Sequence, residues 1–211
     1  MNRFLVTTAL GVAFVSATAL GQYKAAPAGA PPSEVPAAFS QLLEKDGTKI
    51  TDGSGKVVAE VWLRSAIPKG APSGEENVTL PNVAHGTLLG VLRAPNQYND
   101  RRGQVIKPGV YTLRYSMFPI NGDHQGVAPQ RDFFVLTRME DDKDPNVNPD
   151  FKTLMSWSKK AAGTPHPLVL SIWNADDPKP DFSQQGESDW VLTRKAGDTA
   201  LSIVLIGKAS A

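Results

Sequence analysis

Cysteine is absent from this chain of 211 residues, and its absence excludes several kinds of chemistry at once. The chain can form no disulfide and offers no thiolate metal ligand, no cysteine nucleophile and no attachment site for c-type haem or a lipoprotein acyl chain. Histidine is scarce, with three residues, which excludes a histidine-rich centre. Familiar catalytic motifs are also lacking: the sequence contains no Gly-x-Ser-x-Gly, His-Glu-x-x-His, Walker or Rossmann pattern.

An excess of charge of either sign is missing too. Lys and Arg total 22 and Asp and Glu total 21, which gives a net charge of +1. This balance does not indicate a nucleic-acid-binding surface or a polybasic membrane anchor. Hydrophobic residues make up 41% and charged residues 20% of the chain, as is typical of a globular protein. We therefore expect no nucleic-acid partner.

The first 21 residues predict a cleaved export signal. A positive start at Arg3 is followed by a largely apolar run from Phe4 to Val15. Ala19-Leu20-Gly21 fits the small-x-small cleavage rule, which places the mature start at Gln22, with cleavage after Ala19 as the alternative. The apolar run is shorter than the ~20 residues of a comfortable membrane span. We expect a periplasmic or extracellular protein without a membrane span after cleavage.

Residues 22–38 differ in composition from the remainder of the chain. They are rich in alanine and proline, as in Ala25-Ala26-Pro27-Ala28. Side chains this small cannot build a core, and the prolines favour an extended chain. We predict a poorly packed spacer over residues 22–38 and a single domain over residues 39–211.

Most of residues 39–211 carry the signals of short β-strands separated by turns. In the segment 109–118, Tyr111, Leu113 and Tyr115 alternate with more polar side chains after a Pro-Gly turn. The segment 199–206 is apolar on both faces, which indicates a central strand. Further strands are expected over residues 49–51, 56–64, 86–93, 132–139, 167–173 and 189–194.

These seven to nine strands predict an all-β fold with one helix. The favoured architecture is a single β-sandwich, jelly-roll or immunoglobulin-like, and a closed barrel is the alternative. The helix is expected near residues 149–162. Asn148 would be its N-cap, Pro149 its first residue and Gly163 its terminator.

The segment 119–132 is the strongest candidate for a binding site. It joins two predicted strands and is much longer than a hairpin turn requires. It carries Asp123, His124, Arg131 and Asp132. Binding sites often lie on such loops, and His124 could act as a metal ligand or general base beside either aspartate. The structural alternative is that Arg131 pairs with a nearby acid and His124 is a hydrogen-bonded surface residue.

His166 is a second candidate, because two prolines flank it and restrict its backbone. If the end of the helix packs near the segment 119–132, His124, His166 and an aspartate could share a divalent metal ion. The alternative is that the two prolines only direct the chain into the next strand. His85 has no acid beside it and is predicted to be structural.

Two further patterns allow both a functional and a structural interpretation. Oxygen-bearing side chains alternate over residues 144–150, as in the first half of a calcium loop. Pro149, however, stands where that loop has glycine, and turn and capping propensities already explain Asn148 and Asp150. The four tryptophans could form an aromatic platform for a sugar, although tryptophan in a sandwich is more often core.

The sequence favours a non-enzymatic binding or envelope-associated module that recognises a small or polymeric ligand through residues 119–132. The first alternative is a metal-dependent hydrolase or metal-carrying protein that uses His124, His166 and a nearby aspartate. The second is a purely structural or partner-binding envelope protein with an apolar exposed patch. The favoured interpretation needs no cofactor, whereas the first alternative needs a divalent metal ion.

Overall fold

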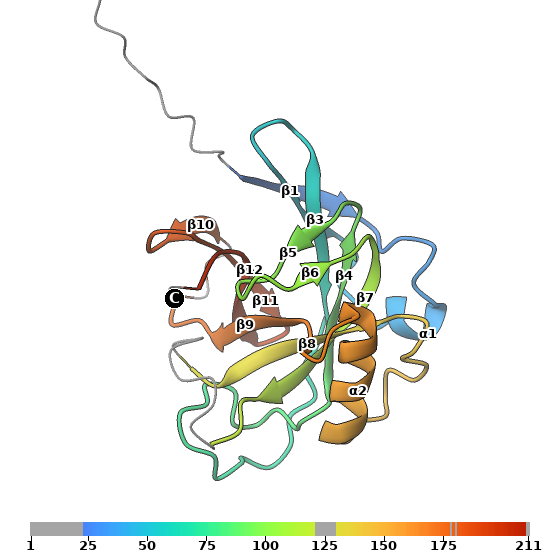
Figure 1. Ribbon diagram of the computed structural model, residues 1–211. Helices are drawn as coiled ribbons and strands as arrows, with labels where there is room; N and C mark the ends of the chain where they lie inside the picture. The colour runs from blue at the N-terminus through green and yellow to red at the C-terminus, as the bar shows by residue number, and fades with distance from the viewer. Residues whose placement is uncertain (1–22, 121–129, 178, 180, 210–211) are drawn as a thin grey trace, which may run out of the picture.

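The computed structural model describes residues 23–120, 130–177, 179 and 181–209. The fold is mostly β, with 42% strand and 9% helix. Ten antiparallel strands make one sheet that nearly closes into a barrel (Figure 1). Their order is β1-β2-β3-β4-β7-β8-β9-β12-β11-β10, and β5 and β6 form a separate two-stranded ribbon. The expected export signal, residues 1–21, lies outside the described residues.

The sheet contains β1 (Lys24–Gly29), β2 (Gly47–Thr51), β3 (Val57–Leu63), β4 (Leu88–Ala94), β7 (Gly109–Met117), β8 (Asp132–Arg138), β9 (Val169–Asn174), β10 (Asp181–Gln185), β11 (Asp189–Ala196) and β12 (Thr199–Ile206). The ribbon contains β5 (Tyr98–Asn99) and β6 (Val105–Ile106). The helices are α1 (Ala37–Ser40) and α2 (Phe151–Ala162).

The expectation of an all-β fold is confirmed, but a single sandwich of seven to nine strands is not. A sandwich needs a break between two sheets, whereas β9 pairs with β8 on one side and with β12 on the other. The closed barrel, the alternative drawn from the sequence, is nearer to the observed form. The expected strand count is too low because β1 and β10 carry mostly exposed small or polar side chains, without apolar alternation.

Alternate residues of the strands fill the inside of the barrel. In β12, Leu201, Ile203 and Leu205 belong to the main buried cluster. β12 lies between β9 and β11, so the expectation of a central strand over residues 199–206 is confirmed. Apolar burial of this kind is the main stabilising contribution in a chain without disulfides.

The alanine- and proline-rich segment adds a strand to the sheet. β1 pairs with β2 in antiparallel register, although most of its residues are exposed. At the end of β1, the carbonyl oxygen of Gly29 accepts a 2.7 Å hydrogen bond from Trp62 Nε1. Gly47 lies against the same indole, where a Cβ would overlap the ring. The segment expected to be a spacer thus joins the domain through β1.

The helix α2 begins two residues later than the expected helix, so Pro149 is not its first residue, and it ends at the expected Ala162. Its N-cap is Asp150, whose carboxylate accepts a 2.7 Å hydrogen bond from the Thr153 backbone N–H. The expectation that Asn148 is the N-cap is wrong, because the chain becomes helical only after Asp150. Gly163 ends the helix with a left-handed φ of 72°, as expected. The buried face of α2 packs against β8, and neither described helix is long and apolar enough to span a bilayer.

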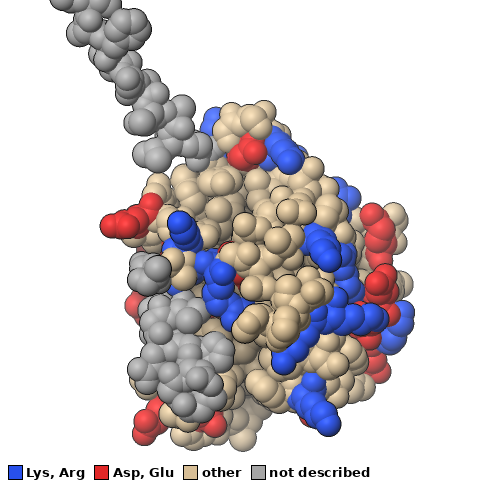
Figure 2. Space-filling model, viewed as in Figure 1, with Lys and Arg blue, Asp and Glu red and all other residues tan. Residues whose placement is uncertain are grey.

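The near-zero net charge hides an uneven distribution of charge over the surface. In the view of Figure 2, Lys and Arg side chains gather over the region of α2, whereas Asp and Glu lie mainly near the margins. The helix itself contributes three exposed lysines, Lys152, Lys159 and Lys160, and no acid. Lys160 pairs with the carboxylate of Asp141, which offsets part of this positive charge.

Candidate functional site

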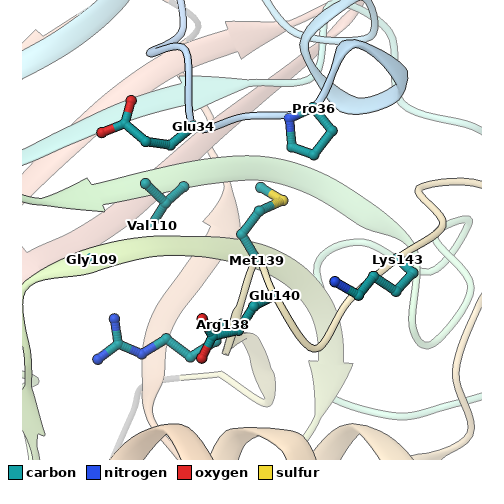
Figure 3. Close-up of a pocket in the computed structure, with 8 residues that line it drawn as sticks. All are labelled: Glu34, Pro36, Gly109, Val110, Arg138, Met139, Glu140 and Lys143. Carbon is teal, nitrogen blue, oxygen red and sulfur yellow. The ribbon is translucent and has the colours of Figure 1, made fainter.

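A pocket of about 450 Å³ opens where the start of β7, the end of β8 and the segment before α1 meet. Its lining residues, drawn in Figure 3, are Glu34, Pro36, Gly109, Val110, Arg138, Met139, Glu140 and Lys143. Val110 and Met139 form an apolar floor, and charged side chains surround it. The volume lies within the range that is usual for small-molecule sites.

The pairing of β7 with β8 positions this floor. Tyr111 pairs directly with Arg138, so the two side chains lie on the same face of the sheet. The backbone N–H of Met139 donates a 3.1 Å hydrogen bond to the Val110 carbonyl oxygen, which continues the pairing one residue past β8. The floor of the pocket is therefore built on paired backbone.

Three neighbours hold the side chain of Arg138. Its Cζ lies 4.5 Å from the centroid of the Tyr111 ring, in a cation–π contact. Its Nη1 donates a 2.8 Å hydrogen bond to the Pro108 carbonyl oxygen. Gly109, with a φ of 149°, lies so close that a Cβ there would overlap the guanidinium. The Tyr111 ring is fixed in turn, because its hydroxyl donates to the Lys107 carbonyl oxygen at 2.6 Å.

The guanidinium of Arg138 lies at the edge of the pocket and keeps donors available there (Figure 3). Among the described residues, no carboxylate forms an ion pair with Arg138, and its Nε and Nη2 donate no hydrogen bond. The side chain is partly buried, which strengthens its attraction for an anion. A guanidinium binds a carboxylate through two parallel hydrogen bonds. Arg138 can therefore bind the carboxylate of a ligand.

The remaining charged groups of the pocket balance Arg138. Glu34 and Glu140 are exposed acids, and Lys143 is an exposed base. The formal charges of these four side chains sum to zero. A neutral pocket that presents both signs is complementary to a ligand that also carries both signs.

Tyr111 supports the site as a neutral ring. Burial raises the pKa of the Tyr111 hydroxyl, and the nearby positive charge of Arg138 opposes this rise. The phenol therefore keeps its proton at neutral pH. Its aromatic face remains the surface on which the guanidinium rests.

One side of the pocket belongs to the segment between β8 and α2, and Arg114 anchors that segment. The guanidinium binds the carboxylate of Asp142 through Nε at 2.6 Å and Nη2 at 2.7 Å. It also donates to the carbonyl oxygens of Asp144 at 2.7 Å and Val147 at 2.8 Å. Because the Arg114 side chain is 0% exposed, these contacts fix the segment from inside the protein.

Asp132, an expected ligand-binding residue, is fully buried at the start of β8. Its carboxylate accepts hydrogen bonds from the backbone N–H groups of Thr79 at 2.7 Å and Leu80 at 3.2 Å. It accepts a further hydrogen bond from the Tyr115 hydroxyl at 2.7 Å. Burial and this neighbouring carboxylate both raise the pKa of Tyr115. Asp132 thus joins the segment around Thr79 to the sheet, and a role in ligand binding stays a prediction.

Arg131, another expected ligand-binding residue, also has partners within the protein. Its Nε donates to the Phe118 carbonyl oxygen at 2.7 Å, which closes the base of the loop. Its Nη1 donates to a carboxylate oxygen of Glu75 and to the Glu76 carbonyl oxygen, both at 2.8 Å. The pairing with Glu75 agrees with the structural alternative for Arg131. Its role in ligand binding stays a prediction.

Of the two histidines in the expected metal site, the structure describes only His166. Asp123 and His124 lie outside those residues. His166 is exposed, and its backbone N–H donates to the Thr164 hydroxyl at 3.2 Å. In the part of the chain that the structure describes, no three His, Asp or Glu side chains gather closely enough to hold a metal ion. A metal site with His124, His166 and an aspartate stays a prediction.

The residues of the calcium-like pattern have separate structural contacts. The carboxylate of Asp144 accepts a 2.9 Å hydrogen bond from the Asn146 backbone N–H, as in a local turn. The amide of Asn148 lies 3.4 Å from the Thr87 hydroxyl. The carboxylate of Asp150 caps α2. A turn contact of Asp144 and the capping contact of Asp150 are in line with the structural interpretation, whereas Asn148 contacts Thr87 instead.

No direct signal in the sequence points to Arg138. It stands near the end of the predicted strand 132–139, where an arginine is an ordinary half-exposed residue. Only its pairing with Tyr111 across β7 and β8 shows that ring and guanidinium meet. A tyrosine and an arginine in two adjacent predicted strands are the signal that could identify the site, once the strand register is known.

Comparison of the chain with protein-family models, with curated proteins and with solved structures gave no match. Any function must therefore be inferred from the described residues. Among them, Arg138 lines a pocket, its side chain is fixed by its neighbours, and it has hydrogen-bond donors available to a ligand.

Proposed function

We propose that this protein is an exported, non-enzymatic binding module that holds a small zwitterionic ligand in the pocket around Arg138. The observation that carries the proposal is the guanidinium of Arg138, which rests on Tyr111 and is bonded to Pro108 through Nη1 alone. A side chain already fixed in this way loses little conformational entropy when a ligand binds. Its remaining donors are those that a carboxylate requires.

The other lining residues define the rest of the ligand. Glu34 and Glu140 offer carboxylates to a ligand ammonium group, and Val110 and Met139 offer apolar surface between the charges. An amino acid or a short peptide carries these three features in one molecule. The volume of about 450 Å³ favours a short peptide, because it exceeds what one small amino acid fills.

Isothermal titration calorimetry with the dipeptide alanyl-leucine tests this proposal. We expect the dipeptide to bind, its C-terminal amide to bind about tenfold more weakly or worse, and its N-acetyl derivative to lose affinity as well. Arg138→Lys keeps the charge but removes the planar fork, and should also cost about tenfold in affinity. The matched control is Arg194→Lys, because Arg194 is a partly exposed arginine that pairs with Glu44 instead.

Several outcomes would refute the proposed site. Failure of all three probes to bind would do so, and so would equal affinity of the dipeptide and its amide. Loss of binding in His124→Ala or Arg131→Ala, with binding unchanged in Arg138→Lys, would show that the ligand binds at residues 119–132 instead. An equal effect of Arg138→Lys and Arg194→Lys would show that the change is not specific to the pocket.

Export is the second part of the proposal, and the N-terminus of the mature protein tests it. Tyr23 is the first residue that the structure describes, and the centroid of its ring lies 5.4 Å from that of the Trp190 ring. Cleavage before Gln22 would leave this contact in place. Mass spectrometry of protein recovered from the periplasm or medium should find a chain that starts at Gln22, or at Leu20 if cleavage occurs after Ala19. A chain retained in the cytoplasm with Met1 intact would contradict export.

A further inference from the structure

A row of polar and aromatic side chains crosses four neighbouring strands at one end of the sheet. Asp181 of β10 pairs with Thr193 of β11, Thr193 pairs with Ser202 of β12, and Ser202 pairs with Trp173 of β9. Directly paired residues of adjacent strands place their side chains on the same face. The row Asp181-Thr193-Ser202-Trp173 therefore forms one continuous strip.

This strip lies on the outer face of the barrel. The neighbouring residues Leu192, Leu201 and Ile203 belong to the cluster that fills the interior. Since side chains alternate along a strand, Thr193 and Ser202 point outward. They are nevertheless only 7% and 3% exposed. Outward-pointing hydroxyls that are this well shielded occupy a depression in the surface.

The depression is a pocket of about 230 Å³ with a second wall. The described residues of the connection between β9 and β10 supply this wall, which consists of Ala175, Asp176, Asp177 and Lys179. Lys179 Nζ lies 3.9 Å from the carboxylate of Asp177. Gln185 of β10 also lines the pocket. It is four residues after Asp181 and therefore lies on the same side of the strand. None of these residues lines the pocket around Arg138.

The lining combines hydrogen-bonding groups of every kind with one aromatic ring. The hydroxyls of Thr193 and Ser202 are 2.8 Å apart and bonded to each other, which leaves further acceptor capacity on both oxygens. The aspartates supply acceptors, Lys179 supplies donors, and the amide of Gln185 supplies both donors and acceptors. The face of the Trp173 indole is apolar and carries partial negative charge. It attracts the partly positive C–H groups on the face of a ligand ring.

From this combination we propose that the pocket binds one unit of a neutral sugar. A sugar ring presents C–H groups on its faces and hydroxyls around its edge, and each hydroxyl both donates and accepts. An organic ammonium ion would need only acceptors and an aromatic face. It would leave the donors of Gln185 without a partner and would face the positive charge of Lys179. The volume suits a single ring. The proposal stands apart from the zwitterion site, because the two pockets share no residue.

Saturation-transfer NMR with the methyl glycosides of glucose, galactose, mannose and N-acetylglucosamine tests the proposal. At least one glycoside should receive saturation from the wild-type protein, with millimolar affinity. Gln185→Leu should weaken this binding about tenfold. The matched control is Gln184→Leu, because Gln184 is the adjacent glutamine on the opposite side of β10, where its amide bonds the Glu187 carbonyl oxygen. Gln184→Leu should bind as the wild type does.

Trp173→Leu provides a second variant, with thermal melting used to verify that it folds. It should abolish saturation of the sugar ring protons, because the aromatic face is gone. Absence of saturation with every glycoside in the wild type would overturn the proposal. Unchanged binding in both Gln185→Leu and Trp173→Leu, or equal weakening in Gln184→Leu, would also overturn it. Binding of tetramethylammonium without any glycoside would identify an organic-cation site instead.

Discussion

Arg114 and Asp142 form an ion pair that is closed off from solvent, with side-chain exposures of 0% and 1%. The hydroxyl of Thr112 donates to the same carboxylate at 2.6 Å, and Arg114 Nη1 donates to the Gly86 carbonyl oxygen at 2.7 Å. The pair thereby attaches the segment between β8 and α2 to the centre of β7. Because that segment forms one side of the Arg138 pocket, the pair also determines the shape of the pocket.

Removal of one partner of this pair should be strongly destabilising. Arg114→Met leaves the carboxylate of Asp142 buried without its cation, and we expect a loss of about 3–5 kcal/mol in the free energy of unfolding. Urea unfolding at neutral pH, monitored by circular dichroism, measures this loss. Lys69→Met serves as the control, because Lys69 and Asp198 are 3.9 Å apart and both largely exposed. That variant should unfold at the wild-type midpoint. A small loss in Arg114→Met would show that the pair does not anchor the segment.

His85 should make the stability of the fold depend on pH. Its Nδ1 lies 3.1 Å from the Ser116 hydroxyl, and its Nε2 is buried without a partner among the described residues. Burial lowers the pKa of His85, although the nearby Asp150 opposes the effect. The unfolded chain therefore takes up a proton at a higher pH than the folded chain. Stability should fall as the pH drops below the ordinary histidine value of 6.5.

Thermal melts between about pH 7.5 and about pH 5.5 test this dependence. The melting temperature of the wild type should decline as the pH falls across this interval. The decline should be smaller in His85→Leu, because this variant has no imidazole at position 85 to take up a proton. His166→Leu is the comparison, because His166 is exposed. If His166→Leu reduces the decline as much as His85→Leu does, the assignment to His85 is wrong.

Much of the fold is predictable from local sequence, because most strands bury apolar side chains in a regular pattern. The segment 109–118 alternates aromatic and polar residues, and it coincides with β7 (Gly109–Met117). β1 and β10 lack such a pattern. Their residues are held by hydrogen bonding to β2 and β11, which the composition of Lys24–Gly29 and Asp181–Gln185 does not reveal. The closure of the sheet depends on these two edges, so a sandwich and a barrel cannot be told apart without them.

The candidate site was less predictable than the fold, because it depends on strand register. Loop length and composition drew attention to residues 119–132, where Arg131 and Asp132 turn out to bond protein groups. The partners of Asp132, at Thr79 and Leu80, are more than fifty residues away in sequence. Arg138 in turn meets Tyr111 only through the pairing of β7 with β8. Contacts between residues so far apart in the sequence cannot be predicted from local sequence patterns.

Metal addition distinguishes the binding module from the metal-dependent alternative. For the binding module, we expect no change in melting temperature when zinc, copper, manganese or calcium is added singly after treatment with a chelator. Binding of an ion to the native state would raise the melting temperature by mass action. A rise with a transition metal that disappears in both His124→Ala and His166→Ala would establish the metal site. A rise with calcium alone would direct attention to residues 144–150.

The side-chain N–H resonance of Arg138 offers the most direct test of the zwitterion site. In a ¹⁵N-labelled protein, the Nε–H signal of Arg138 is assigned by its absence from the spectrum of Arg138→Lys. We predict that alanyl-leucine shifts this signal downfield as the carboxylate accepts its hydrogen bond, and that the C-terminal amide of the same dipeptide leaves it unchanged. A signal that stays in place while the dipeptide binds would show that the ligand carboxylate lies elsewhere, and would contradict the proposed function.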